Sequence, residues 1–264
     1  RMQGFAEAAL HKHIASLQED FYTHWKGYSK APFPKDFEQE KINEIINQSI
    51  KRSERYRKLK TSGLSRKEIT KRFKKKTPMT IFSWQGEIDT IMSPLDSIYY
   101  YKYFIHSGMM SMDPTTGHVK AYVGGINYKY FKYDHVTVGK RQVGSTFKPF
   151  LYSLAIQEGY SPCYEIPNVP VVFDKERWGL EKDWAPKNSG DEFEELSLTL
   201  KFGLANSINS ITAYIMKQFG PHAVVDLAKK IGITSKMLPV PSLCLGTFDL
   251  SVYEMVGAYS TFVN

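Results

Sequence analysis

Ser145 and Lys148 form the only Ser-x-x-Lys pair in the chain, within the run Arg141-Gln-Val-Gly-Ser-Thr-Phe-Lys-Pro-Phe150. A serine followed by a lysine three positions later can act as an acylating nucleophile with its base, because residues three apart share one helix face. Roughly one such pair is expected by chance in a chain of this length, so the spacing needs support from its surroundings.

The residues around this pair predict that a helix begins at Ser145 or within one residue of it. Gly144 permits a tight approach before the serine, and Pro149 is tolerated only in the first turn of a helix. Apolar residues at helical spacing follow, ending near Gly159, and they are Phe147, Phe150, Leu151, Leu154 and Ala155. At a helix start, free amide N–H groups and the macrodipole can stabilise an oxyanion that develops at the serine.

Lys148 could take the proton of Ser145 if burial and a nearby positive charge keep its amine neutral. The alternative is an N-cap serine followed by a solvated lysine, since serine is favoured at that position.

A second polar element, Ser207-Ile-Asn209, is the only Ser-x-Asn in the chain and lies between two helix-like apolar runs, 196–205 and 211–219. A polar tripeptide between apolar helices suits the wall of a cleft. The Ser207 hydroxyl could relay a proton to or from Lys148 or a leaving group, and the Asn209 amide could hold a substrate carbonyl. An ordinary turn with a capping serine is the alternative.

Together these residues resemble the penicillin-binding proteins, whose signatures include Ser-x-x-Lys, Ser-x-Asn and a later Lys-Thr-Gly. Other stretches follow the order of a class A transpeptidase domain, and they are 117–125, 141–150, 184–188, 200–209, 245–246 and 258–264. The resemblance implies that Ser145 is the nucleophile, Lys148 its base, and Ser207 with Asn209 the second motif. It also implies a D,D-transpeptidase acting on the D-Ala-D-Ala end of peptidoglycan stem peptides, with β-lactams acylating the same serine.

The third motif of that family, Lys-Thr-Gly, does not occur after Asn209. In the family it lines the cleft, donates one oxyanion-hole N–H and supplies a cation near the base lysine. Loss of one oxyanion donor costs about 10²–10³ in rate in hydrolases. The chain is therefore expected to be a fragment with weak or no activity. The resemblance also implies an inner-membrane anchor and a glycosyltransferase domain outside it, with this part on the periplasmic side.

Residues 1–28 are predicted to form an amphipathic helix with Leu10, Ile14, Leu17 and Phe21 along one face. Glu19 is followed by Asp20 and a nearby histidine. Their spacing differs from the Glu-Asp-x-x-Phe-x-x-His-x-Gly signature of the glycosyltransferase, so no catalytic role is assigned to Glu19.

The basic charge of the chain is concentrated between Lys51 and Lys76, where 13 Lys and Arg face two Glu, a net of +11. The whole chain carries +8, so the remainder sums to −3. A nucleic-acid partner is disfavoured because no recognised module is present and aromatic platforms are few. The composition favours a solvated helical linker near anionic lipid headgroups or acidic glycans.

The pattern changes at Pro78. Residues 79–84 alternate as a strand, and Ser93-Pro-Leu-Asp96 begins a tyrosine-rich helix that extends to about His106. Residues 108–112 and 119–123 are predicted strands of a hairpin, joined across Asp113-Pro-Thr-Thr-Gly117.

The clustered tyrosines are interpreted as packing, with a sugar-binding surface as the alternative, and they are Tyr99, Tyr100, Tyr101 and Tyr103. A second aromatic group is interpreted as a surface loop partly packed on the sheet, with lining of the cleft as the alternative, and it comprises Tyr128, Tyr130, Phe131 and Tyr133.

These elements predict an α+β fold with an antiparallel sheet flanked by helices. Residues 1–77 are predicted to be a helical, basic interdomain linker that follows an absent glycosyltransferase domain. Residues 78–264 are predicted to be the penicillin-binding transpeptidase domain. At 264 residues and 42% hydrophobic, the chain can bury one good core and a small second module.

Cys163 and Cys244 lie 81 positions apart and have no metal-site spacing, so no cofactor or metal is expected, and whether they pair stays open.

Expected partners are stem peptides and glycan strands of peptidoglycan, β-lactam antibiotics and cell-wall synthesis proteins, without nucleic acid. One alternative is a serine β-lactamase or β-lactam sensor, disfavoured by Ile208 where class A lactamases carry an acid. Another is a non-catalytic cell-wall scaffold.

Overall fold

The computed structural model describes all 264 residues, which fold into two compact units. Unit 1 comprises residues 1–3, 108–125 and 133–264, and unit 2 comprises residues 4–107 and 126–132. The division near residue 108 differs from the boundary at 77/78 predicted from the sequence. The basic run ends at Lys76, but residues 78–107 pack within the same unit as the basic helices. The change of composition therefore marks a change of surface chemistry and not of packing.

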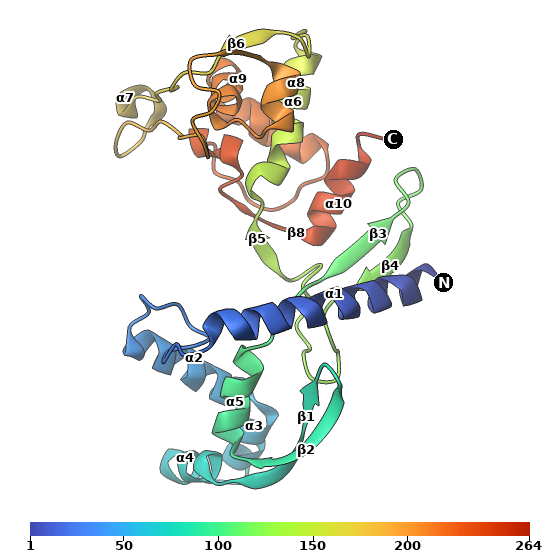
Figure 1. The fold of residues 1–264 in the computed structure, drawn as a ribbon, viewed down its shortest axis with the longest axis vertical. Coiled ribbons are helices and arrows are strands. Elements are labelled where there is room, and N and C mark those ends of the chain that lie inside the picture. Colours follow the sequence, from blue (N-terminus) through green and yellow to red (C-terminus); the bar gives the residue numbers. More distant parts are fainter. The chain divides into compact units, whose positions relative to one another are not determined.

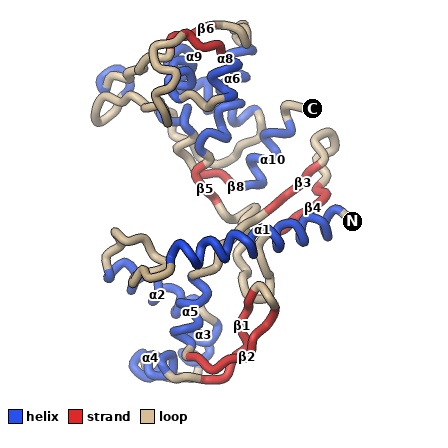
Figure 2. Tube along the Cα trace, in the orientation of Figure 1, coloured by secondary structure: helices blue, strands red, loops and turns tan.

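Unit 2 is mainly helical, with one β-hairpin (Figures 1 and 2). Apart from the first two residues of α1, its elements are α1 (Met2–Trp25), α2 (Gln39–Arg52), α3 (Glu54–Thr61), α4 (Arg66–Lys74), β1 (Thr77–Ser83), β2 (Gly86–Met92) and α5 (Pro94–Lys102). Strands β1 and β2 are antiparallel, with Thr77 opposite Met92 and Ser83 opposite Gly86. The sequence predicted β1 but not its partner β2, whose side chains are mostly exposed.

The buried face of α1 differs from the predicted one. Ala6, Leu10, Ile14 and Gln18 are buried, whereas Leu17 is 41% exposed. Gln18 is fully buried because both ends of its amide are satisfied in unit 2. Its Nε2 donates to the carbonyl of Tyr103 at 2.8 Å, and its Oε1 accepts from the N–H of Ile105 at 2.8 Å. A polar residue thus occupies the position that the hydrophobic pattern assigned to Leu17.

Helix α5 begins where the sequence predicted. Ser93 caps it, Pro94 is its first residue, and Asp96 completes a capping box. The helix ends at Lys102, one turn before the predicted end. The tyrosines of this segment pack inside unit 2, as interpreted from the sequence: the Tyr100 hydroxyl donates to the carbonyl of Phe82 at 2.7 Å, and the Tyr103 hydroxyl donates to that of Ala31 at 2.9 Å.

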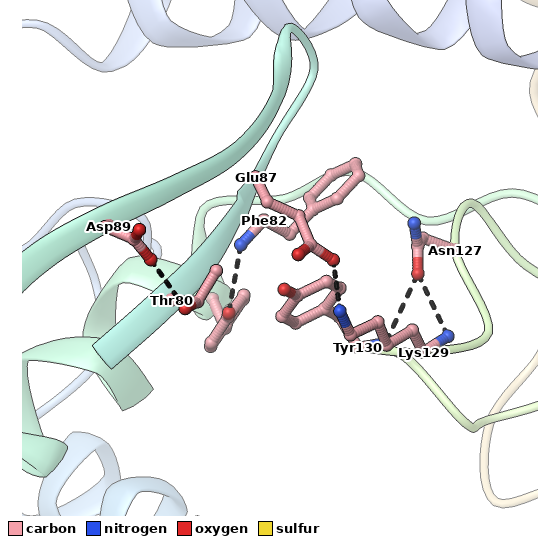
Figure 3. A network of polar contacts seen from close by, with 8 residues as sticks. Thr80, Phe82, Glu87, Asp89, Asn127, Lys129 and Tyr130 are labelled. Atoms are coloured by element: carbon pink, nitrogen blue, oxygen red, sulfur yellow. Dashed lines mark hydrogen bonds and ion pairs between the residues drawn. The ribbon is translucent and has the colours of Figure 1, made fainter.

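Residues 126–132 form a loop that packs on the β1–β2 hairpin (Figure 3). Lys129 forms an ion pair with Glu87, and the side-chain oxygen of Asn127 accepts from the N–H groups of Lys129 at 2.9 Å and Tyr130 at 3.3 Å. The rings of Tyr130 and Phe131 pack against Phe82. These two aromatic residues are partly buried, and their loop packs on the hairpin.

Unit 1 combines a helical core with three antiparallel strand pairs, β3–β4, β5–β8 and β6–β7. Its elements are β3 (Met109–Met112), β4 (Val119–Val123), β5 (Lys140–Gln142), the 3₁₀ turn η1 (Gly144–Phe147), α6 (Lys148–Gln157), β6 (Glu165–Pro167), α7 (Lys175–Trp178), β7 (Ser197–Thr199), α8 (Leu200–Ala205), α9 (Asn209–Lys230), the 3₁₀ turn η2 (Pro241–Leu245), β8 (Asp249–Ser251) and α10 (Val252–Ser260). The predicted hairpin over 108–123 is confirmed, and so is the α+β class.

The core of unit 1 forms where α6, α8 and α9 pack on one another, as Figure 1 shows. Phe147, Leu151, Ile211 and Met216 are fully buried there. A Cβ on Gly203 of α8 would lie 2.9 Å from Ile211, so the glycine permits the close approach of α8 to α9. This core supports the segments that carry both sequence motifs.

The predicted helix over 196–205 is shorter than expected. Leu198 pairs with Ile166 in the β6–β7 ladder, and the helix begins at Leu200, where the Thr199 side chain accepts from the N–H of Phe202. The segment is extended up to Thr199 because its backbone groups pair with a strand that is distant in sequence.

Candidate active site

Ser145 lies in η1, immediately before α6, as the sequence predicted. Its side chain is exposed, and its hydroxyl makes no hydrogen bond. Gly144 has φ +55°, a left-handed conformation that suits glycine, and Pro149 lies in the first turn of α6. A serine hydroxyl is therefore presented to solvent at the start of a helix.

Lys148 is buried in the first turn of α6, with only 1% of its surface exposed. Its Nζ donates to the carbonyl oxygen of Ser207 at 2.7 Å, to the Ser207 hydroxyl at 3.0 Å and to Oδ1 of Asn209 at 2.6 Å. Burial lowers the pKa of the Lys148 ammonium to about 8 because the low-dielectric surroundings penalise the charged form. The structure thus joins Lys148 to the second motif, while the Ser145 hydroxyl is not bonded to it.

Cys244 is the titratable group whose charge would act on Lys148, and it is uncharged near neutral pH. Cys244 in η2 is a buried free thiol whose pKa is raised by burial to about 12, and its charged form would raise the pKa of Lys148 slightly. Tyr152, one turn along α6, is also buried with a pKa of about 12. No carboxylate neutralises the ammonium. Its hydrogen-bond acceptors are three neutral oxygens.

Ser207 and Asn209 lie at the junction of α8 and α9. Ser207 has φ +54°, which costs a residue with a Cβ about 1–2 kcal/mol. This conformation lets both its carbonyl and its hydroxyl reach the same nitrogen. The Asn209 amide is engaged at both ends, since Nδ2 donates to the carbonyl of Lys187 at 2.8 Å. Nδ2 carries a second N–H, so the predicted bond from Asn209 to a substrate carbonyl stays a prediction.

Two residues that support the second motif were given no role in the sequence analysis. The side-chain oxygen of Asn188 accepts from the backbone N–H groups of Asn209 at 2.9 Å and Ser210 at 3.1 Å. Asn168, 3% exposed, accepts in turn from Asn188 Nδ2 at 3.0 Å. Asn188 lay inside a stretch that resembled the family, whereas no local signal distinguished Asn168.

Gly246 supports the segment that precedes Ser145. Its carbonyl accepts from the N–H of Gly144 at 3.0 Å, and the carbonyl of Phe248 accepts from the N–H of Val143 at 3.1 Å. A Cβ on Gly246 would lie 2.1 Å from the carbonyl oxygen of Gly144, and its φ is +66°. Only glycine fits this contact.

A cavity of about 650 Å³ borders the same segment on its apolar side. None of the four motif residues lines it. Its lining is Met112, Pro114, Arg141, Gln142, Val143, Thr146, Leu250, Ser251, Val252, Met255, Val256, Tyr259, Ser260 and Val263. No group of three or more His, Cys, Asp or Glu residues in the chain is arranged to hold a metal ion, and both cysteines are free.

Comparison with known proteins identifies two matched regions. Residues 28–105 match the family described as the penicillin-binding protein middle domain, and residues 107–240 match the penicillin-binding protein transpeptidase domain. The junction of these matches lies beside the division between the two units.

Individual relatives match over about three fifths of the chain. The chain is 33% identical over 159 residues to penicillin-binding protein 1A of Pseudomonas aeruginosa. This match covers 60% of this chain and 19% of the relative. The chain is also 36% identical over 160 residues to penicillin-binding protein 2D of Bacillus subtilis. This match covers 61% of this chain and 23% of that relative. The crystal structure of penicillin-binding protein 1A from Haemophilus influenzae superposes with a TM-score of 0.56 at 29% identity, covering 60% of this chain and 23% of that one. The chain thus spans about a fifth of the length of these relatives.

Proposed function

Because this chain belongs to the penicillin-binding protein family, matched over 107–240 by its transpeptidase domain, we propose that it supplies the acyl-transfer site of a peptidoglycan D,D-transpeptidase. The observation that carries the proposal is the burial of Lys148 among Ser207 and Asn209, with a pKa near 8. A general base is most effective when its pKa lies close to the working pH. A lysine of ordinary pKa would be almost fully protonated there.

The first half of the reaction forms an acyl-enzyme. Loss of one proton leaves Lys148 with two N–H groups for its protein acceptors and a lone pair for the Ser145 hydroxyl. As Lys148 takes that proton, Ser145 Oγ attacks the carbonyl of the penultimate D-Ala of a stem peptide. The C–N bond to the terminal D-Ala then breaks, and its nitrogen receives a proton from Lys148 through the Ser207 hydroxyl.

The second half transfers the acyl group. An amine of a neighbouring stem peptide attacks the Ser145 ester, its proton returns through Lys148 to the Ser145 oxygen, and the cross-link is released. A β-lactam enters the same path because its strained amide replaces the D-Ala-D-Ala bond. Asn209 acts in both halves by holding the Lys148 nitrogen in position.

Lys-Thr-Gly is not found after Asn209 in these residues, so the oxyanion would lack the donor that the third motif supplies. A polypeptide limited to residues 1–264 is therefore expected to be acylated about 10²–10³ times more slowly than one that includes such a motif. No helix of the 264 residues has the length and apolar character needed to cross a membrane. We place this part on the periplasmic side of the inner membrane, attached by an anchor elsewhere in the protein. There its partners are stem peptides, glycan strands and cell-wall synthesis proteins.

The test is intact-mass spectrometry of a polypeptide extended through a Lys-Thr-Gly segment, after treatment with benzylpenicillin. One stable penicilloyl adduct is expected, and Ser145→Ala should remove it. Ser153→Ala provides the matched control, because this serine lies on α6 and only bonds to the carbonyl of Phe150. An adduct that survives Ser145→Ala would refute the nucleophile. Rapid turnover of penicillin would instead identify a β-lactamase, and absence of any adduct would favour a non-catalytic scaffold.

A further inference from the structure

Helix α9 begins without a capping side chain from its own sequence. Ile208 occupies the N-cap position and its side chain cannot accept a hydrogen bond, so the first N–H groups of the helix need partners from elsewhere. Asn188, about twenty residues earlier, supplies one oxygen for two of them, those of Asn209 and Ser210. The cap of α9 is therefore a tertiary contact.

The Asn188 side chain is itself held in place. Its Nδ2 donates to Oδ1 of Asn168 at 3.0 Å, and the Ser210 hydroxyl donates to the same Asn168 oxygen. Asn168 Nδ2 donates to the carbonyl of Phe193 at 2.5 Å. Asn168 and Ser210 are each 3% exposed, Asn188 is partly buried, and every amide group in the network has a partner.

The neighbouring residue Lys187 completes the hold on Asn209. Its carbonyl accepts from Asn209 Nδ2, while Asn188 accepts from the Asn209 backbone N–H. With its amide nitrogen occupied, Asn209 presents its oxygen to the Lys148 nitrogen at 2.6 Å. The consecutive residues Lys187 and Asn188 thus determine both the backbone position and the amide orientation of Asn209.

We infer that Asn188, supported by Asn168, is a positioning residue that fixes the Asn209 oxygen against the Lys148 nitrogen, an inference that rests on the proposed function. It acts through Asn209 and does not contact the reacting atoms.

The use of an amide here has a chemical reason. A carboxylate would cap α9 more strongly, because it favours the positive end of a helix. It would also place a negative charge beside the second motif and favour the ammonium form of Lys148. Cys244 is the titratable group whose charge acts on Lys148, and its thiol is uncharged near neutral pH. A neutral amide at position 188 adds no charge beside the second motif.

The test compares two variants in the extended polypeptide, with the pH dependence of penicillin acylation as readout. Asn188→Ala removes the cap, and we expect the acylation rate constant to fall at least about tenfold while the dissociation constant for penicillin changes less than twofold. Asn188→Asp keeps the acceptor oxygen. We expect it to remain folded, with the acid limb of its pH profile shifted upward by about half a unit to one unit. The control Asp174→Ala removes the cap of α7 in the same unit, and its rate and profile should match the unmodified protein.

A second readout separates failure of this inference from failure of the proposed function. The pH dependence of Lys148 acetylation by acetic anhydride, followed by peptide mass spectrometry, requires no acylation of Ser145. An upward shift of its midpoint in Asn188→Asp would support the inference even if Ser145 proved unreactive. Wild-type rates in Asn188→Ala, an unshifted profile in Asn188→Asp, or equal losses in Asp174→Ala would each overturn it.

Discussion

At the residue scale, Lys148 combines two properties that normally exclude each other. It is a lysine with 1% exposure, yet no carboxylate pairs with it. Buried charges are costly unless they are paired, and a lysine in such a place lowers its pKa instead. Three neutral oxygens keep the nitrogen bonded without stabilising the ammonium as strongly as a carboxylate would. Ser145 and Lys148 were linked in the sequence by their spacing, by the helix start around them and by the family resemblance, and their catalytic roles stay a prediction.

The low pKa of Lys148 predicts how acylation depends on pH. Because the base acts in its deprotonated form, the acylation rate should rise about tenfold per pH unit below the pKa and level off above about 8. The measurement is the second-order rate constant for benzylpenicillin between pH 6 and 10. Lys148→Arg should abolish the reaction, because a guanidinium stays protonated throughout this range. A profile that is flat or falls with pH would contradict the role of Lys148 as base.

At the element scale, Gly144 and Gly246 form a matched pair of glycines on the two segments that meet before Ser145. Both have positive φ, +55° and +66°, but only at Gly246 would a Cβ strike another backbone. Gly144→Ala should cost about 1–2 kcal/mol of unfolding free energy, since only conformational strain is added. Gly246→Ala should cost more than about 3 kcal/mol or displace η1. Urea unfolding of both variants measures the difference, and equal losses would show that the contact adds nothing.

Glu254, in the first turn of α10, ties three segments of unit 1 together. Its carboxylate accepts hydrogen bonds from the backbone N–H and the hydroxyl of each of Thr234, Ser235 and Ser251. Burial raises the pKa of Glu254, but the hydrogen bonds from Ser235 and Ser251 outweigh burial and lower it to about 2. The charged form is therefore favoured in the folded state.

This lowered pKa predicts a pH-dependent contribution to stability. The contribution of Glu254 is complete above its unfolded-state pKa near 4.5 and is lost as the pH falls toward 2. Glu254→Gln should lower the unfolding free energy by about 2–3 kcal/mol at pH 7, and the difference from wild type should shrink between pH 5 and about 2. Urea titrations at several pH values test this. The control Glu68→Gln alters an exposed capping box of α4 and should change the unfolding free energy much less. A loss of unfolding free energy in Glu254→Gln that does not depend on pH would contradict this account.

At the scale of the whole molecule, the charge of the chain is segregated. All 13 basic side chains between Lys51 and Lys76 are exposed on or beside α2, α3 and α4, while Ile69 and Phe73 of α4 are buried. The helices thus keep their apolar residues inside unit 2 and their cations in solvent. We predict from this exposed charge that the surface binds an anionic partner such as lipid headgroups.

The segregated charge predicts salt-dependent binding to anionic vesicles. Co-sedimentation with phosphatidylglycerol-containing vesicles should weaken steeply between about 0.05 and 0.5 M salt, because screening shortens the range of the attraction. Neutralising Lys71, Arg72 and Lys75 to Gln should weaken binding. A control variant makes the same charge change in unit 1 by replacing the exposed residues Lys201, Lys230 and Lys236 with Gln. Its affinity for the vesicles should stay closer to that of the wild type. Binding that is unaffected by salt would contradict the electrostatic account.

The division into units also belongs to this scale. Composition placed a boundary at 77/78, whereas contacts place it near 108, beside the junction of the two family matches. The boundary between two units depends on which buried surfaces pack together. The basic run is a surface feature that ends at Lys76, whereas the unit to which it belongs continues to residue 107. Ile42 and Ile46 of α2 pack with Leu95 and Ile98 of α5, across the predicted boundary.

The amino-acid sequence by itself determined the features that depend on near neighbours in the chain. These include the start of α5 at Ser93, the hairpin turn at Asp113–Gly117, the helical start around Ser145, and the two motifs with their family resemblance. Each arises from backbone preferences or capping bonds that span only a few residues, so the local sequence carries enough information.

Only the tertiary structure decided how the site is arranged. The bonds from Lys148 to Ser207 and Asn209 span about sixty residues, and the cap from Asn188 to α9 spans about twenty. Burial lowers the pKa of Lys148, and the helix that carries it packs against segments as distant as η2. A pKa and an amide orientation are set by whatever surrounds the group in space. Those surroundings exist only once the chain has folded.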